Sequence, residues 1–138
     1  MGDKMNRENN GLVDRMRLDN GLVLEMYDRS RPVAGDRWMI AFEARIEVVV
    51  KHELISDLTT PDPSFEDLHR VLGDKAVYRY KKVRNFIDAR QKDEVFTALK
   101  EHFIRTSLGY LSSAHFPQKL LLRKYFDAQH AERMWRRH

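Results

Sequence analysis

The longest regular pattern of hydrophobic and polar positions runs from Arg37 to Lys51. Apolar residues fill every second position of it, namely Trp38, Ile40, Phe42, Ala44, Ile46, Val48 and Val50. A period of two with many β-branched residues predicts a β-strand that is covered on one face. At the usual rise, the run would approach about 50 Å, which exceeds the usual strand length. Such a strand is expected to bend, to extend beyond its neighbours, or to reach a second chain.

A β-hairpin is predicted for the segment from Leu12 to Asp28, with its turn near Asn20-Gly21. Asn-Gly is typical of a two-residue turn, but that register mixes polar and apolar residues on each face. A three-residue loop with Gly21 in the left-handed conformation pairs Leu18 with Leu22 and collects the apolar residues on one face. Because a slip of one residue exchanges the two faces, the apolar pattern favours the three-residue loop.

Two segments lack a regular period. Residues 1–10 are polar and are predicted to form a mobile, disordered tail. The segment from Asp28 to Asp36 is predicted to be a connecting loop, because Pro32 and Gly35 both oppose regular structure there.

The rest of the chain predicts helices and one more strand. A short helix is expected from Phe65 to Leu72, and Ala76 to Ile87 are expected to form a strand. Two helices should follow, one that opens at Asp88 and one that begins at Pro117 and runs toward Arg136. Ser64 with Asp67 three residues later resembles a capping box, which marks the start of the short helix. Gly73 and Gly109 are expected to end the short helix and the helix that opens at Asp88.

This order of elements predicts an α+β fold. The antiparallel sheet would contain the N-terminal hairpin, one long strand and one later strand. A short helix would be inserted before the last strand, and the two C-terminal helices would pack on the sheet. Residues 11–138 are predicted to form a single domain of this kind.

Composition narrows the class of protein. The chain has 138 residues, a formal charge of +4 and no cysteine, which excludes a disulfide scaffold, a cysteine-ligated metal site and a cysteine nucleophile. No stretch approaches the roughly 20 apolar residues of a membrane span, and the polar start lacks the apolar region of a secretory signal, so a cytoplasmic location is expected. Residues 1–60 hold 9 Lys or Arg and 11 Asp or Glu, whereas residues 61–138 hold 16 and 10. The basic excess is therefore C-terminal.

The predicted strand from Ala76 to Ile87 carries the strongest functional hint. Alternation places Tyr78, Tyr80, Lys82 and Arg84 on one face, and no acidic residue interrupts the stretch. Cations beside aromatic rings are typical of a surface that binds nucleic acid, where the rings stack on bases and the cations contact phosphates. Binding of a nucleic acid or another polyanion is therefore our leading hypothesis. The simpler interpretation is an edge strand on which lysine discourages aggregation.

Two features favour a different hypothesis, a protein-interaction or self-association module. The strand from Arg37 to Lys51 is unusually long, and the apolar residues of the last helix spread over a wide arc. Both surfaces could exceed what one chain covers, so a protein partner or a homodimer is expected in this case. Basic residues on the last helix, such as Arg123 and Lys124, would suit docking of that helix on a partner.

The loop after the hairpin suggests a third hypothesis, an anion or nucleotide sensor that uses Ser30, Arg31 and Arg37, because arginine presents paired donors to phosphate. Asp28-Arg29-Ser30 resembles the opening of the Asp-x-Ser-x-x-Gly motif of PilZ domains, and this resemblance implies binding of a cyclic dinucleotide. Val33 stands where that motif has glycine, Gly35 is displaced by two, and no Arg-x-x-x-Arg precedes the loop.

No motif in the sequence predicts an enzyme. The six histidines show no His-x-His or His-x-x-x-His spacing, and there is no glycine-rich phosphate loop or Gly-x-Ser-x-Gly elbow. We therefore expect no catalytic residues, no metal site and no cofactor.

Overall fold

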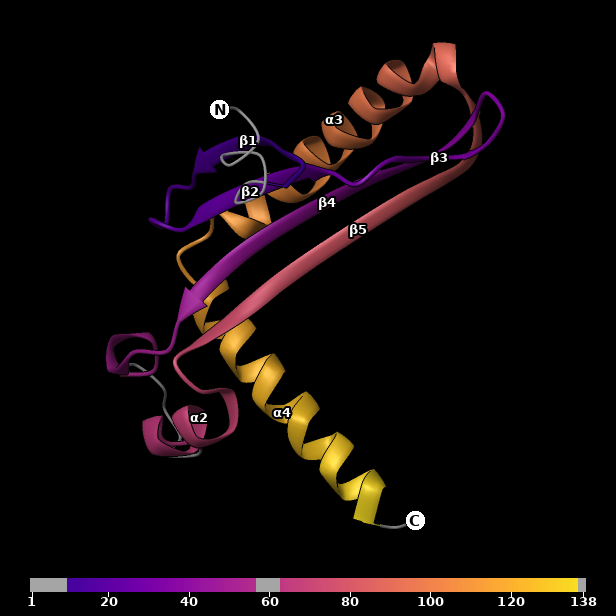
Figure 1. Ribbon diagram of the computed structural model, residues 1–138. Helices are drawn as coiled ribbons and strands as arrows, with labels where there is room; N and C mark the ends of the chain where they lie inside the picture. Colours follow the sequence, from indigo (N-terminus) through magenta and orange to yellow (C-terminus); the bar gives the residue numbers. More distant parts are fainter. Residues whose placement is uncertain (1–9, 57–62, 137–138) are drawn as a thin grey trace, which may run out of the picture. The chain divides into compact units, whose positions relative to one another are not determined.

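A computed structural model describes residues 10–56 and 63–136 of the protein. Within these residues five strands form one antiparallel sheet, accompanied by three α-helices (Figure 1). The elements in chain order are β1 (Leu12–Arg17), β2 (Val23–Asp28), β3 (Arg31–Ala34), β4 (Arg37–Val49), the 3-10 turn η1 (His52–Leu54), α2 (Phe65–Leu72), β5 (Lys75–Asp88), the 3-10 turn η2 (Ala89–Gln91), α3 (Lys92–Leu111) and α4 (Phe116–Arg136). The predicted α+β class is confirmed. The tail predicted for residues 1–10 lies outside the described residues, except for Asn10.

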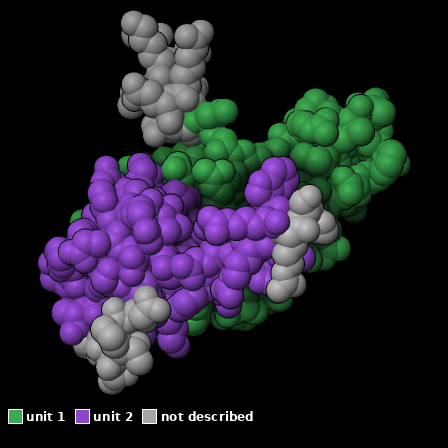
Figure 2. Space-filling model, turned by 90° about the horizontal axis from the view of Figure 1, so that it is seen from below, with its two compact units in different colours: residues 1–46, 79–112 green, residues 47–78, 113–138 purple. Residues whose placement is uncertain are grey.

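The chain divides into two compact units (Figure 2). Unit 1 contains residues 1–46 and 79–112, and unit 2 contains residues 47–78 and 113–138. The strands β4 and β5 contribute residues to both units. The prediction of a single domain for residues 11–138 stays a prediction.

The hairpin of β1 and β2 has the register that the apolar pattern favoured. The Leu18 N–H donates to the Leu22 carbonyl at 2.8 Å, and the Gly21 N–H donates to the Leu18 carbonyl at 2.9 Å. Gly21 adopts a φ of 88°, in the left-handed region that glycine reaches without steric cost. Met16 pairs with Leu24 farther along the ladder. The three-residue loop is confirmed.

The long strand β4 shows the predicted alternation in its burial, except at Ala41, which is fully buried as well. All five of its residues at alternate positions from Ile40 to Val48 are at most 1% exposed, whereas Glu47 and Val49 between and beyond them are exposed. Its partners are β2, β3 and β5. The strand is therefore covered and paired by the chain itself.

The loop predicted from Asp28 to Asp36 is wrong, because the segment forms the edge strand β3 and a tight turn into β4. Pro32 pairs with Trp38, and an edge strand tolerates the N–H that proline lacks. Gly35 adopts a φ of 57° between the paired residues Ala34 and Arg37, as a two-residue hairpin turn requires. Pro32 and Gly35, which were expected to interrupt regular structure, therefore belong to the hairpin of β3 and β4.

Aromatic rings form the centre of unit 1. The Phe42 ring of β4 lies 5.9 Å from the Phe96 ring and 5.3 Å from the Phe103 ring of α3, between ring centroids. Phe42 and Phe103 are fully buried. These contacts hold α3 against the sheet within this unit. Removing one such ring from water contributes about 2–3 kcal/mol to the free energy of unfolding.

Helix α3 runs past Gly109 to Leu111, so the predicted stop at Gly109 is wrong. Glycine inside a helix costs only about 1 kcal/mol, which tertiary contacts can offset. One such contact is made by the hairpin turn, where the Asn20 side-chain amide donates to the Leu111 carbonyl at 2.8 Å. This bond satisfies a carbonyl that the helix end leaves without an internal partner.

Unit 2 contains the short helix α2 and the last helix, which pack on each other. The predicted capping box is confirmed, since Asp67 N–H donates to the Ser64 hydroxyl and Ser64 N–H donates to the Asp67 carboxylate. Gly73 ends α2 at a φ of 78°, as predicted. The predicted extent of the last helix is confirmed to within a residue, and no helix among residues 10–56 and 63–136 is long and apolar enough to cross a membrane.

Candidate polyanion surface on strand β5

Strand β5 carries a basic segment that the rest of the described chain leaves exposed. Its β-branched and aromatic residues, such as Val77 and Tyr80, suit a strand. The strand pairs with β4 alone, so among the described residues its other edge has no strand partner. We call its four exposed cations the β5 basic surface; they are Arg79, Lys81, Lys82 and Arg84.

None of these four cations forms an ion pair with a described residue. Lys75, at the start of the same strand, contrasts with them, because its ammonium group lies 3.2 Å from the Glu47 carboxylate. No acidic residue stands between Lys75 and Asp88. The positive charge of the β5 basic surface is therefore not neutralised by neighbours on its own strand.

Alternation distributes the surface over two faces of the strand. Arg79 and Lys81 belong to one face, and Lys82 and Arg84 belong to the other. Cations on one face of a strand recur about every 6.6 Å, at two residues per repeat. Each face therefore carries two cations at this spacing, and a ligand with repeated anionic groups that follows the open edge of β5 can contact the cations of both faces.

The two tyrosines predicted to belong to this site lie half-buried against phenylalanines. The Tyr80 ring centroid lies 4.7 Å from that of Phe103 and 6.2 Å from that of Phe42. In unit 2 the Tyr78 ring meets the Phe116 ring edge to face, at 5.8 Å. These contacts give both rings a packing role, so we leave Tyr78 and Tyr80 out of the β5 basic surface. A stacking role for them stays a prediction.

Phe86 is an aromatic residue of β5 that the sequence analysis missed. It is 69% exposed and adopts a φ of 57°. Apart from glycines, it has the one positive φ among residues 10–56 and 63–136. Bulky residues rarely adopt this conformation, and such outliers cluster at functional sites. The sequence held no signal for this feature, because a period of two places Phe86 on the same face as Tyr80.

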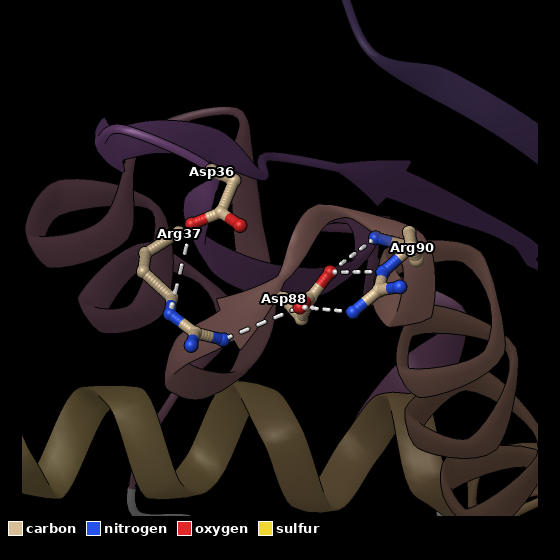
Figure 3. Close-up of polar contacts among 4 residues, drawn as sticks. All are labelled: Asp36, Arg37, Asp88 and Arg90. Atoms are coloured by element: carbon tan, nitrogen blue, oxygen red, sulfur yellow. Dashed lines mark hydrogen bonds and ion pairs between the residues drawn. The ribbon is translucent and has the colours of Figure 1, made fainter.

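A cluster of charged side chains holds the end of β5 next to Phe86 (Figure 3). The Asp88 carboxylate accepts from the Arg90 backbone N–H at 2.8 Å and pairs with the Arg90 guanidinium at 3.2 Å. The Arg37 guanidinium lies 3.6 Å from Asp88 and 3.8 Å from the Asp36 carboxylate. A backbone bond of 2.8 Å from the Ala89 N–H to the Asp36 carbonyl joins the same two segments. The β3–β4 turn is thereby fixed to the end of β5.

The same cluster sets the ionisation of Asp88. The hydrogen bond from the Arg90 side chain, followed by that from its backbone N–H, holds the pKa of the Asp88 carboxyl below its ordinary value, and the charge of Arg37 lowers it further. The folded pKa thus lies below the unfolded pKa. The resulting stabilisation is complete above the ordinary aspartate pKa of about 3.9 and is lost as the pH falls through the lowered value.

Replacing Asp88 by asparagine is expected to destabilise the protein at neutral pH, while keeping an oxygen that can accept the Arg90 N–H. The difference in free energy of unfolding between wild type and Asp88→Asn should shrink as the pH falls and vanish below the lowered pKa. Urea unfolding followed by circular dichroism over a pH series measures it. Asp127→Asn is the control, because Asp127 is exposed and forms no ion pair with a described residue. A difference for Asp88→Asn that stays constant with pH would contradict the assignment.

The residues of the predicted anion loop have mostly structural partners. The Ser30 hydroxyl accepts from the Ala41 N–H at 3.0 Å, and the Ser30 N–H donates to the Asp28 carboxylate at 2.9 Å. Arg37 belongs to the cluster around Asp88, while Arg31 is exposed on β3. No contact among the described residues brings Ser30, Arg31 and Arg37 together around one ligand position. The sensor hypothesis stays a prediction.

Within the part of the chain that the structure describes, no three His, Cys, Asp or Glu residues gather as ligands of one ion. His69 instead lies 2.9 Å from the Asp74 carboxylate in unit 2.

Comparison of the chain with protein-family models, with curated proteins and with solved structures found no match. The function is therefore inferred from the residues of β5 themselves.

Proposed function

We propose that the protein is a non-enzymatic binding domain that binds a polyanion on the β5 basic surface. The observation that carries the proposal is the absence of any ion pair between Arg79, Lys81, Lys82 or Arg84 and the described residues. Because these four side chains are exposed, an anionic ligand can contact them without first breaking an internal salt bridge. The cytoplasmic location expected from the sequence belongs to the same proposal.

The energetic argument rests on counterions. Cations in a row attract salt anions, and a polyanion carries its own condensed cations; binding releases both into the solvent. The gain falls as the salt concentration rises, since release into a concentrated solution is worth less. Four contacts should therefore allow binding at low salt, with an affinity that decreases measurably as the salt concentration rises.

Of the two observations that suggested self-association, the apolar arc of α4 still leaves Phe126, Met134 and Trp135 exposed, but the long strand no longer supports it. The apolar face of β4 is buried by the chain itself, with Phe42 and Ile46 fully inaccessible. The open edge of β5 is also a poor template for a second β5, because pairing of two such edges would bring like charges opposite each other. At the open edge of β5 we therefore favour an anionic ligand over a second copy of the chain.

Fluorescence anisotropy tests the proposal with two labelled probes, a heparin-derived oligosaccharide and oligo-dT. At the single-strand value of about 0.7 per contacted phosphate, four contacts give a slope near −3 in log affinity against log salt. The affinity for oligo-dT should then fall about 50-fold between about 50 and 200 mM salt. Failure of both probes to bind at low salt, or binding that salt does not weaken, would overturn the proposal.

A further inference from the structure

Phe86 combines two unfavourable features at one position. Its ring is 69% exposed, although apolar rings gain free energy when they are removed from water. Its backbone is held at a φ of 57°, a region that L-residues avoid and that persists only when the surrounding structure imposes it. Neither feature contributes to packing. A ligand that covers the ring would account for the exposure.

The chain is held in place on the C-terminal side of Phe86. Two residues farther along, Asp88 pairs with Arg37 and Arg90, and the Ala89 N–H is bonded to the Asp36 carbonyl. The end of β5 is therefore anchored immediately after the strained residue. The ring is presented from a backbone held in place, which lowers the entropic cost of contact with a ligand.

The exposed ring follows directly on the β5 basic surface. Arg84 lies two residues before Phe86, and Lys82 lies two residues before Arg84. All three side chains are exposed. A ligand that follows the row of cations thus reaches an aromatic face at its end.

We infer that the polyanion is a single-stranded nucleic acid and that Phe86 stacks on one of its bases. This inference rests on the proposed function of the β5 basic surface. Sulfated polysaccharides offer anionic groups without aromatic faces, and a duplex keeps its base faces stacked inside. A single strand offers phosphates together with free base faces, and stacking on an aromatic side chain tolerates any base.

The test compares variants of the full chain at Phe86. Phe86→Ala and Phe86→Leu remove the aromatic face, whereas Phe86→Trp keeps one. Phe86→Gly also removes the ring and accepts the positive φ freely, so it should fold at least as stably as wild type. Circular dichroism and thermal melting confirm that each variant is folded before binding is measured.

Anisotropy titrations then use labelled oligo-dT, the same strand annealed to oligo-dA, and the heparin-derived oligosaccharide. We expect wild type to prefer the single strand, and Phe86→Ala, Phe86→Leu and Phe86→Gly to lose at least about fivefold in affinity for oligo-dT. Phe86→Trp should bind oligo-dT like wild type, and heparin affinity should be the same for all variants.

Each contrary result has a defined meaning. Unchanged oligo-dT affinity in the folded variants that lack the ring overturns the inference. An affinity for oligo-dT that Phe86→Leu alone retains also overturns it, because an apolar contact would then replace stacking. Heparin binding without preference for the single strand overturns the inference and leaves the proposed function standing. No binding of wild type to any probe overturns both.

Discussion

Replacing Phe42 by alanine is expected to lower the free energy of unfolding by about 3–5 kcal/mol, the range for large-to-small changes at buried aromatic residues. Phe42 is fully buried, and its ring contacts Phe96, Phe103 and Tyr80. Alanine would leave a cavity between β4 and α3 within unit 1. A loss of this size is a large fraction of the stability of a typical domain, about 5–15 kcal/mol.

Urea unfolding followed by circular dichroism measures this loss. Phe126→Ala is a matched control, because it removes the same side chain from α4, where the ring is 49% exposed. The control should cost less than about 1 kcal/mol, as surface changes usually do. If Phe42→Ala were no more destabilising than Phe126→Ala, the described core of unit 1 would be wrong.

The elements that the sequence predicted well depend on local patterns. In β4, alternation assigns each side chain to a face, and a register shift of one would expose Phe42 and Ile46. In the first hairpin, the same argument selected the turn around Gly21. The capping box at Ser64 is also local, since both of its hydrogen bonds join residues three apart.

The elements that it predicted poorly depend on partners distant in the chain. Pro32 and Gly35 can end regular structure or serve an edge strand and its turn, and pairing with β4 decides between these roles. Gly109 does not stop α3, and the bond from Asn20 supports the end of that helix from a distant hairpin. Local propensity could not anticipate these contacts.

The candidate site was predicted in part. The exposed cations Lys82 and Arg84 were identified from their position on a strand without acidic residues. The contacts of Tyr78 and Tyr80 depend on where Phe116 and Phe103 pack, which a period of two does not specify. The left-handed backbone of Phe86 leaves no trace in a pattern of polar and apolar residues.

Reversal of two charges on β5, Lys82→Glu with Arg84→Glu, is expected to lower the affinity for oligo-dT at least about tenfold at low salt. The change removes two contacts to the polyanion and places two carboxylates in its path, and like charges at an interface cost several kcal/mol. Both side chains are exposed and form no ion pair with a described residue, so the fold should tolerate the change. Loss of two contacts should also reduce the slope of log affinity against log salt by about 1.4.

Net charge alone could weaken binding of any anion, so a control must change the total charge equally. Lys119→Glu with Arg123→Glu does so on α4, where both side chains are exposed and neither pairs with a described residue. If binding takes place on β5, this variant should keep most of its affinity and a slope close to that of wild type. Both variants are checked by circular dichroism before titration.

The salt dependence of oligo-dT binding, measured side by side for wild type, the β5 reversal and the α4 reversal, tests the β5 basic surface most directly. We predict a slope near −3 for wild type and for the α4 variant, and a weaker affinity with a slope nearer −1.5 for the β5 variant, at about 0.7 per phosphate contact. Equal losses in the two variants, or a β5 variant that binds like wild type, would contradict binding at Arg79, Lys81, Lys82 and Arg84.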